Sequence, residues 1–403
     1  MPTLQIAGAK TASAIAEAGG TLVLHSRHYH GALLRTLYEA EGIDAGSILH
    51  DAGRIAADGS HGVFTIGHDA GSGLAESVRS AGLGKLTDAA LRADGTGELR
   101  LDVSHFARAW SERYPSAATP VCAATAGVLS SMLTRHHGRP LAVEETACAA
   151  GGDDACTFSV AHSEVAPGRE TPPRRAASAG QGERAARHDD GGLIDDLFGD
   201  GFGPDEDGVI AGPGGPFTLL PAAFYAAVAE GFEREVPRQR GAKFGNLPGI
   251  LLQEASHRNG FNLFGEVLRS AAWRERVEPR IATAEERLRM LLRLVGALGW
   301  GRWDVTSFAA GERLIVRVGD SYEAAAHGHF FGRAGSPRCY VARGAAAAIM
   351  NLLFRADSLR GPELTDSDYN RLFRSPASFR AVETRCRAMG DPVCEIVANP
   401  LSL

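Results

Sequence analysis

The chain has 403 residues, 44% hydrophobic and 22% charged, and its 42 basic against 48 acidic residues give a net charge of −6. This length allows about two or three domains with buried cores. The acidic balance argues against a dedicated nucleic-acid binder, and no apolar run reaches the roughly 18–20 residues of a membrane span. The N-terminus lacks the charged and apolar regions of a signal peptide, so we expect a cytoplasmic protein.

Helices and short strands are predicted in each part of the chain from the periodicity of apolar residues. In the first part we expect a helix from Leu33 to Leu49, a strand at 99–103, a helix at 123–134 and strands at 141–143 and 157–160. In the second part we expect helices at 224–235, 246–259, 261–276 and 284–298, a strand at 314–318 and a helix at 340–354. This order predicts an α+β fold for each part.

An internal repeat relates the two parts. A shift of 217 residues places Ser104 on Ser321, Cys122 on Cys339 and other motif residues on identical ones, including Pro120 on Pro337 and Gly127 on Gly344. The shift then becomes 238, so the second copy carries 21 extra residues, and it aligns Glu145 with Glu383, Cys148 with Cys386 and Cys156 with Cys394. We therefore predict an N-terminal tail (1–19) and two homologous domains (20–162 and 217–398).

The segment between the copies, residues 163–216, has a different composition. Residues 168–187 are rich in Arg, Pro, Ala and Gly, and 189–208 contain eight acidic residues. Such a segment buries too little apolar surface to offset its ordering entropy, which predicts a flexible linker. The apolar residues between Leu193 and Phe198 are either a hydrophobic patch in a tether or a short helix that docks on a protein partner or on the chain's own domains. Residues 189–208 are therefore a candidate partner-binding segment.

Three thiols and one carboxylate recur with the same spacing in both copies. Zn²⁺ accepts tetrahedral sulfur and oxygen ligands, and a site filled by four protein ligands is structural rather than catalytic. Two alternatives remain open, namely small cysteines that fill the core and a redox disulfide with one odd thiol per domain. The candidate ligands are Cys122, Glu145, Cys148 and Cys156 in the first copy, and Cys339, Glu383, Cys386 and Cys394 in the second.

The pattern from Ser104 and Pro120-Val121-Cys122 through Gly127, Glu145, Cys148 and Asp153 to Cys156 and Phe158 resembles the vinyl-4-reductase (4VR) domain. That family includes proteins associated with bacteriochlorophyll 4-vinyl reduction and the aromatic-sensing modules of phenol- and xylene-responsive activators, and it is related to TRAPP vesicle-tethering subunits. In the phenol sensors a similar Cys-Glu-Cys-Cys set binds zinc. The resemblance therefore implies one zinc ion per domain, held by the eight residues given above.

The resemblance also implies a pocket for a small hydrophobic or aromatic ligand between helices and sheet. Candidate lining residues are Leu101, Phe106, Trp303, Phe308 and Tyr322, with a plain core role as the alternative. Domains of this type pair through their helices, so the two copies are expected to form a pair within one chain, with a homo-oligomer left open. The tryptophan that contacts ligand in the phenol sensors is missing before Ser104, which places phenol itself in doubt.

Three functions remain after this reading. The first is a ligand-binding regulatory protein, since no ATPase module, helix-turn-helix segment or recurring catalytic arrangement accompanies the two copies. The second is a TRAPP-like scaffold that assembles a complex. The third is a tetrapyrrole 4-vinyl reductase or its accessory, although no NAD(P) or flavin fingerprint is present to supply a hydride. A non-enzymatic role is favoured.

Overall fold

A computed structural model describes residues 22–59, 64, 66, 70–164, 191–199, 202–356 and 364–401. The first half (residues 22–162) contains β1 (Leu22–Ser26), α2 (Arg27–Tyr38), α3 (Ala45–Gly59), α4 (Ala70–Ser80), β2 (Gly84–Leu91), β3 (Gly97–Ser104), α5 (His105–Ser111), α6 (Ala123–His137), β4 (Leu141–Ala147) and β5 (Cys156–His162).

The second half (residues 217–400) contains β6 (Phe217–Pro221), α8 (Ala222–Arg240), α9 (Leu247–Arg269), α10 (Ala284–Ala297), β7 (Trp303–Ala309), β8 (Arg313–Val318), α11 (Tyr322–Phe330), α12 (Tyr340–Phe354), α13 (Asp366–Phe373), β9 (Phe379–Arg385) and β10 (Cys394–Pro400). The predicted α+β class is confirmed.

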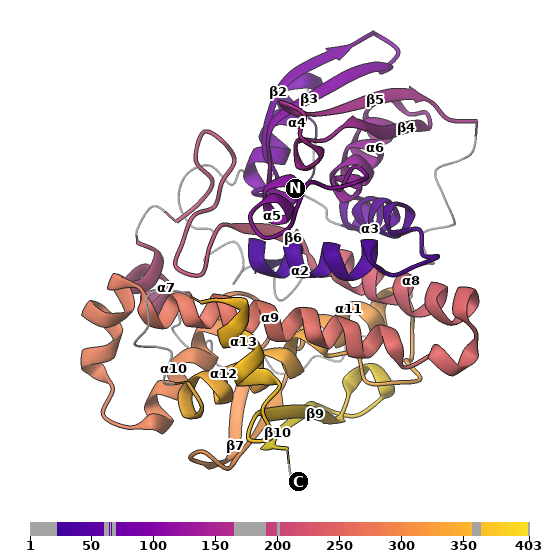
Figure 1. Ribbon diagram of the computed structural model, residues 1–403. Coiled ribbons are helices and arrows are strands. Elements are labelled where there is room, and N and C mark those ends of the chain that lie inside the picture. Colours follow the sequence, from indigo (N-terminus) through magenta and orange to yellow (C-terminus); the bar gives the residue numbers. More distant parts are fainter. Residues whose placement is uncertain are drawn as a thin grey trace.

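Each half has a four-stranded antiparallel sheet with the same strand order. The order is β2-β3-β5-β4 in the first half and β7-β8-β10-β9 in the second. The predicted strands at 99–103, 141–143, 157–160 and 314–318 fall within β3, β4, β5 and β8. The two sheets lie at opposite ends of the molecule, with α2, α8 and α9 between them (Figure 1).

The halves are joined by a two-stranded sheet. β1 and β6 pair antiparallel, with Leu24 opposite Leu219, and both strands are fully buried. The backbone contacts around this pair cross between the halves, because the amide of Leu24 donates to the carbonyl of Leu298 and that of Leu219 to Ala81, both over 2.9 Å. Helix α2 packs on α9 and α3 packs on α8. This reciprocal arrangement has the character of a two-fold interface.

The repeated glycines, Gly127 and Gly344, explain how closely the helices of each half approach. A Cβ atom at Gly127 on α6 would lie 2.0 Å from the carbonyl oxygen of His50 on α3. One at Gly344 on α12 would lie 2.3 Å from the Cβ of Ser256 on α9. A larger side chain at either position would separate helices that carry the core of each half.

Two helix boundaries differ from the sequence prediction. The helix expected from Leu33 to Leu49 is two helices, because Gly42 adopts a φ of 75° and the Asp44 side chain accepts the Ser47 amide hydrogen over 2.9 Å at the start of α3. The helices expected at 246–259 and 261–276 are mostly one helix, α9, which tolerates Gly260 in its interior. Among the described helices, none is both long enough and apolar enough to cross a membrane.

Part of the predicted linker packs against both halves. Residues 191–198 form α7, whose Leu193 and Leu197 are buried where it contacts α10 and the π-helical turn η3 (Trp273–Val277). Asp196 forms an ion pair with Arg280 over 2.5 Å. Ile210 is fully buried and pairs with the start of β6. The acidic composition concealed these apolar anchors, and the predicted segment 168–187 lies outside the described residues.

Candidate metal centres

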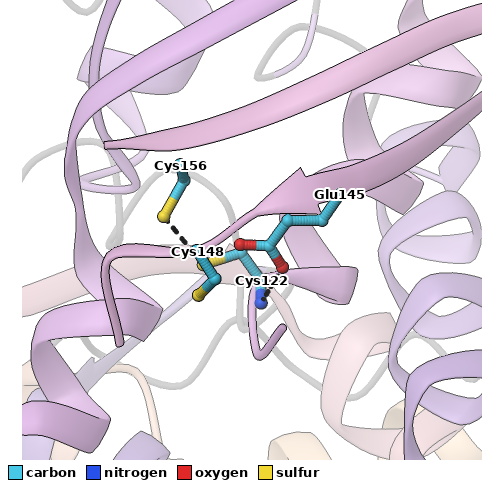
Figure 2. A group of neighbouring side chains, drawn as sticks. All are labelled: Cys122, Glu145, Cys148 and Cys156. Carbon is cyan, nitrogen blue, oxygen red and sulfur yellow. Dashed lines mark hydrogen bonds between the residues drawn. The ribbon is translucent and has the colours of Figure 1, made fainter. Parts of the chain in front are cut away.

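The four first-half candidate residues come together from three elements. Cys122 directly precedes α6, Glu145 lies on β4, Cys148 follows β4, and Cys156 begins β5 (Figure 2). Their ligand atoms all lie within 4.8 Å of one another, and the Cys122 and Cys156 sulfurs are 3.6 Å apart. A disulfide would need about 2.05 Å. Two sulfurs bound tetrahedrally to one Zn²⁺ at about 2.3 Å would lie about 3.8 Å apart.

A tight turn positions the two later thiols. A 3-10 turn at Ala149–Gly151 follows Cys148, and Gly152 has a φ of 107°, which favours glycine. The Asp153 carboxylate accepts the Cys148 amide hydrogen over 2.8 Å, and the Ala149 amide donates to the Cys156 sulfur over 3.4 Å. The local sequence therefore brings both sulfurs to one side of the hairpin.

The glutamates carry the clearest signal that a cation is required. One oxygen of Glu145 accepts the Cys122 amide hydrogen over 2.6 Å, and one oxygen of Glu383 accepts the Cys339 amide hydrogen over 2.9 Å. The other oxygen, Oε1, is buried without a hydrogen-bond partner in both residues. Buried polar atoms are rarely left unpaired. A metal ion among the sulfurs would give each free oxygen a partner, so the residues present fit such an ion.

The electrostatics of the two groups agree with this interpretation. Burial and the nearby Cys148 raise the pKa of Glu145 to about 8, and burial and Cys386 raise the pKa of Glu383 to about 7. Burial also raises the pKa of Cys122 and of Cys339 well above the ordinary thiol value. Four acids in one buried place cannot all ionise without a compensating positive charge.

The second-half group reproduces the first despite the 21 additional residues. The Cys339 and Cys394 sulfurs are 3.4 Å apart, and the ligand atoms of Cys339, Glu383, Cys386 and Cys394 all lie within 4.8 Å of one another. Asp391 again accepts the amide hydrogen of the second cysteine over 2.8 Å. Ser104 and Ser321 each lie 3.1 Å from the first cysteine sulfur of their half. The additional residues lie between α12 and β9, away from the ligands, so each group could hold a metal ion.

The surroundings of the second group contain polar contacts that the sequence did not reveal. Arg338 and Tyr340, which flank Cys339, both bind the carboxylate of Glu233 on α8. Glu323 is buried and accepts amide hydrogens from Val341 and Ala342 at the start of α12 over 3.0–3.2 Å. At the aligned positions the first half has Phe106 for Glu323 and Val121 for Arg338. Charge pairs over this sequence distance leave no local pattern.

The five candidate pocket residues lie in or beside the core. Leu101, Phe106 and Tyr322 are fully buried, Trp303 is 9% exposed, and Phe308 is partly buried against Phe354. Phe106 contacts Phe224 and Tyr322 contacts His25, so these two rings lie at the contact between the halves. The Trp303 indole nitrogen is buried without a partner.

A buried group of histidines and tyrosines fills the contact between the halves. His105 bonds His30 over 3.0 Å, His30 bonds the Tyr225 hydroxyl over 3.2 Å, and His25 bonds the Tyr322 hydroxyl over 2.8 Å. Burial lowers the pKa of His30 to about 3 and that of His25 and His105 well below 6.5, which keeps the rings neutral. The sequence identified His25 and His30 only as core or solvated residues.

Comparison with known proteins supports the resemblance in the first half. Residues 103–162 match the family model of the vinyl-4-reductase (4VR) domain, and this range contains Cys122, Glu145, Cys148 and Cys156. The chain is similar to the crystal structure of the phenol-responsive sensory domain of the transcription activator PoxR with phenol. That similarity has 18% identity and a TM-score of 0.30, and it covers 44% of this chain and 74% of the other. No curated protein sequence matches the chain.

Proposed function

We propose that the chain is a ligand-binding regulatory protein built from two zinc-stabilised domains of the vinyl-4-reductase type that pair within one chain. The observation that carries this proposal is the duplicated Cys-Glu-Cys-Cys group, with one unpaired buried carboxylate oxygen in each copy. Zinc suits this donor set and, when bound, supplies positive charge and cross-links three elements of each half without redox chemistry. The ligands are Cys122, Glu145, Cys148 and Cys156, and Cys339, Glu383, Cys386 and Cys394.

The proposed ligand is a small hydrophobic or aromatic molecule bound between helices and sheet. Its support is the position of Phe106 and Tyr322, which contact rings of the opposite half. A ligand that displaces either ring would change the packing between the halves, and this change is the proposed signal. The unpaired indole N–H of Trp303 offers a hydrogen bond to an acceptor atom of such a ligand.

The domain boundaries at 20–162 and 217–398 and a cytoplasmic location belong to the same proposal. All six cysteines are unpaired by disulfides, as a reducing compartment requires. Binding of a protein partner to residues 189–208 would compete with the contacts that α7 makes on its own chain. Further association of the chain into a homo-oligomer would be measured by native mass.

Elemental analysis and ligand binding test the proposal together. Protein purified without chelator is expected to carry about two zinc ions per chain, and small apolar aromatics are expected to raise its melting temperature. Protein in which Trp303→Phe replaces the unpaired indole donor should lose part of that shift while keeping its zinc. A metal content near zero, or the absence of any shift across a broad aromatic library, would contradict the proposal.

A further inference from the structure

Two adjoining cavities lie where the halves meet beside α2 and α9. Their volumes are about 490 and 460 Å³, and both are lined by Ala32, Tyr114 and Arg258. The first half contributes α2 and the residues after α5, and the second half contributes the end of α8, α9 and residues around α13. Small-molecule sites are commonly of this size and commonly lie at domain interfaces.

The additional residues of the second half build one wall of this paired cavity. Residues 138–140 connect α6 to β4 in the first half, whereas residues 355–378 connect α12 to β9. Leu364, Asp366 and Arg374 from the longer connection line the cavities. Helix α13 is fixed on α9, because Tyr369 donates to Glu254 over 2.8 Å and the Arg258 guanidinium lies 4.4 Å from its ring centre. A connection of the first-half length could not form this wall.

The carboxylates of the cavities already have cationic partners. Glu39 pairs with Arg35 over 2.8 Å, Glu112 pairs with Arg27, and Asp366 pairs with Arg258 over 3.3 Å. Glu254, the fourth carboxylate, lies 3.7 Å from Arg258 and accepts the Tyr369 hydroxyl.

Two guanidinium groups lack such a partner. Arg374 has no side-chain hydrogen bond or ion pair among the residues that the structure describes. Arg113 donates only to neutral acceptors, His28 over 3.0 Å and Asn262 over 2.8 Å. The cavities therefore hold unpaired positive charge. The nearby carboxylates Glu254 and Asp366 would repel a dianion more than a monoanion, which favours a single negative charge on the ligand.

The wall opposite these charges is apolar and comes from both halves. In the larger cavity the apolar lining residues are Ala32, Ala40, Val236, Leu247, Leu251 and Ala255. A planar guanidinium matches a carboxylate in a bidentate pair, and this pair strengthens where apolar walls limit water. The site thus combines a carboxylate-binding group with a surface for a hydrocarbon body.

We propose that this paired cavity, here called the junction site, binds an organic monocarboxylate with an apolar body. The carboxylate pairs with Arg374, Arg113 supplies the second positive charge across the shared wall, and the hydrocarbon part lies along α2 and α9. The junction site is separate from the metal groups and from the pocket proposed inside each half. Because it contacts both halves at once, its ligand would stabilise one arrangement of the halves.

Isothermal titration of the full, metal-loaded chain with 3-phenylpropionate, 4-phenylbutyrate and 6-phenylhexanoate tests the proposal. At least one of these acids should bind, and its uncharged alcohol analogue should bind at least about tenfold more weakly. The variant Arg374→Gln should weaken binding by about tenfold, and Thr36→Trp, which fills the cavity beside α2, should abolish it. Arg113→Gln should weaken binding by a smaller factor.

The matched control is Arg371→Gln, which removes an exposed guanidinium from α13, outside the junction site, and should leave affinity within about twofold. Metal content and melting temperature are measured for every variant, so that a folding defect is recognised. Lack of binding by all three acids at millimolar concentration would overturn the proposal. So would equal binding of the alcohols, or unchanged affinity in both Arg374→Gln and Arg113→Gln. These outcomes do not depend on zinc or on aromatic ligands of the inner pocket.

Discussion

The two halves are nearly identical at their cysteine groups and different around them. Ligand atoms, supporting serines and turn aspartates correspond residue for residue in the two groups. Next to the second group, however, Glu233 is bonded to Arg338 and Tyr340, and α13 covers α9. Four buried acids tolerate little change, because any missing partner leaves an uncompensated charge. The surrounding helices carry no such constraint, so they are where the halves have acquired separate properties.

The largest expected effect tests the correspondence itself. Cys148→Ser and Cys386→Ser should each lower the free energy of unfolding by several kcal/mol, since an incomplete set loses much of the roughly 10–16 kcal/mol of apparent zinc binding. Elemental analysis should show about one metal ion per chain in either variant. Asp154→Asn, an exposed change in the same turn as Cys148, is the control. If both cysteine variants melted like the wild type, the metal assignment would be wrong.

The second prediction concerns the contact present in one half alone. Glu233→Gln removes the charge that Arg338 meets, and both side chains are largely buried, at 16% and 11% exposure. Removing one partner of such a pair typically costs about 3–5 kcal/mol. Thermal unfolding should show this loss, and chelator should remove one of the two metal ions faster than in the wild type. Glu39→Gln, which breaks an exposed pair on α2, should change little. Equal release of both ions would show that this contact does not support the second group.

The third prediction uses the aligned ring pairs His30 with His105 and Tyr225 with Tyr322. Because burial lowers the pKa of His30 to about 3, the folded chain binds fewer protons than the unfolded chain between pH 6.5 and 3. Its stability should therefore fall as the pH falls through this window. His30→Gln should reduce that slope by up to about 1.4 kcal/mol per pH unit. Urea titrations at several pH values measure it, with the exposed His136→Gln as control. An unchanged slope would contradict the neutral-ring assignment.

The smallest expected effect sharpens the comparison. Ser104→Ala and Ser321→Ala remove hydroxyls that lie 3.1 Å from the Cys122 and Cys339 sulfurs. Loss of such an outer contact typically weakens metal binding by about tenfold or more. The two variants should lose affinity by similar factors in competition with a zinc indicator. Ser159→Ala, on β5 outside the ligand set, serves as control. Unequal losses would mean that the two groups differ more than their geometry indicates.

Much of this architecture follows from short-range features of the sequence. The cysteine spacing, the glycine-containing turn and the repeated Gly127 and Gly344 predict the ligand sets, because each feature constrains backbone within a few residues. The strands followed from alternation in the same way. These are the features that the repeat duplicates.

The remaining features depend on contacts between distant residues. The break at Gly42 depends on a single left-handed residue, and the docking of α7 depends on a few apolar side chains inside an acidic segment. The bond between His25 and Tyr322 joins positions 297 residues apart, and that between Arg113 and Asn262 joins positions 149 apart. Periodicity within one copy cannot report them. The junction site was invisible for the same reason.

The covalent connection between β1 and β6 has a consequence for how such a protein responds to its surroundings. In a dimer of separate subunits, dilution dissociates the pair, and identical chains must change together. Here the partner strands belong to one polypeptide, so each encounters the other at a high effective concentration that does not vary with expression level. Substitutions can then accumulate on one side alone, as α13 illustrates, and give a unit that resembles a heterodimer but is inherited as a single gene product.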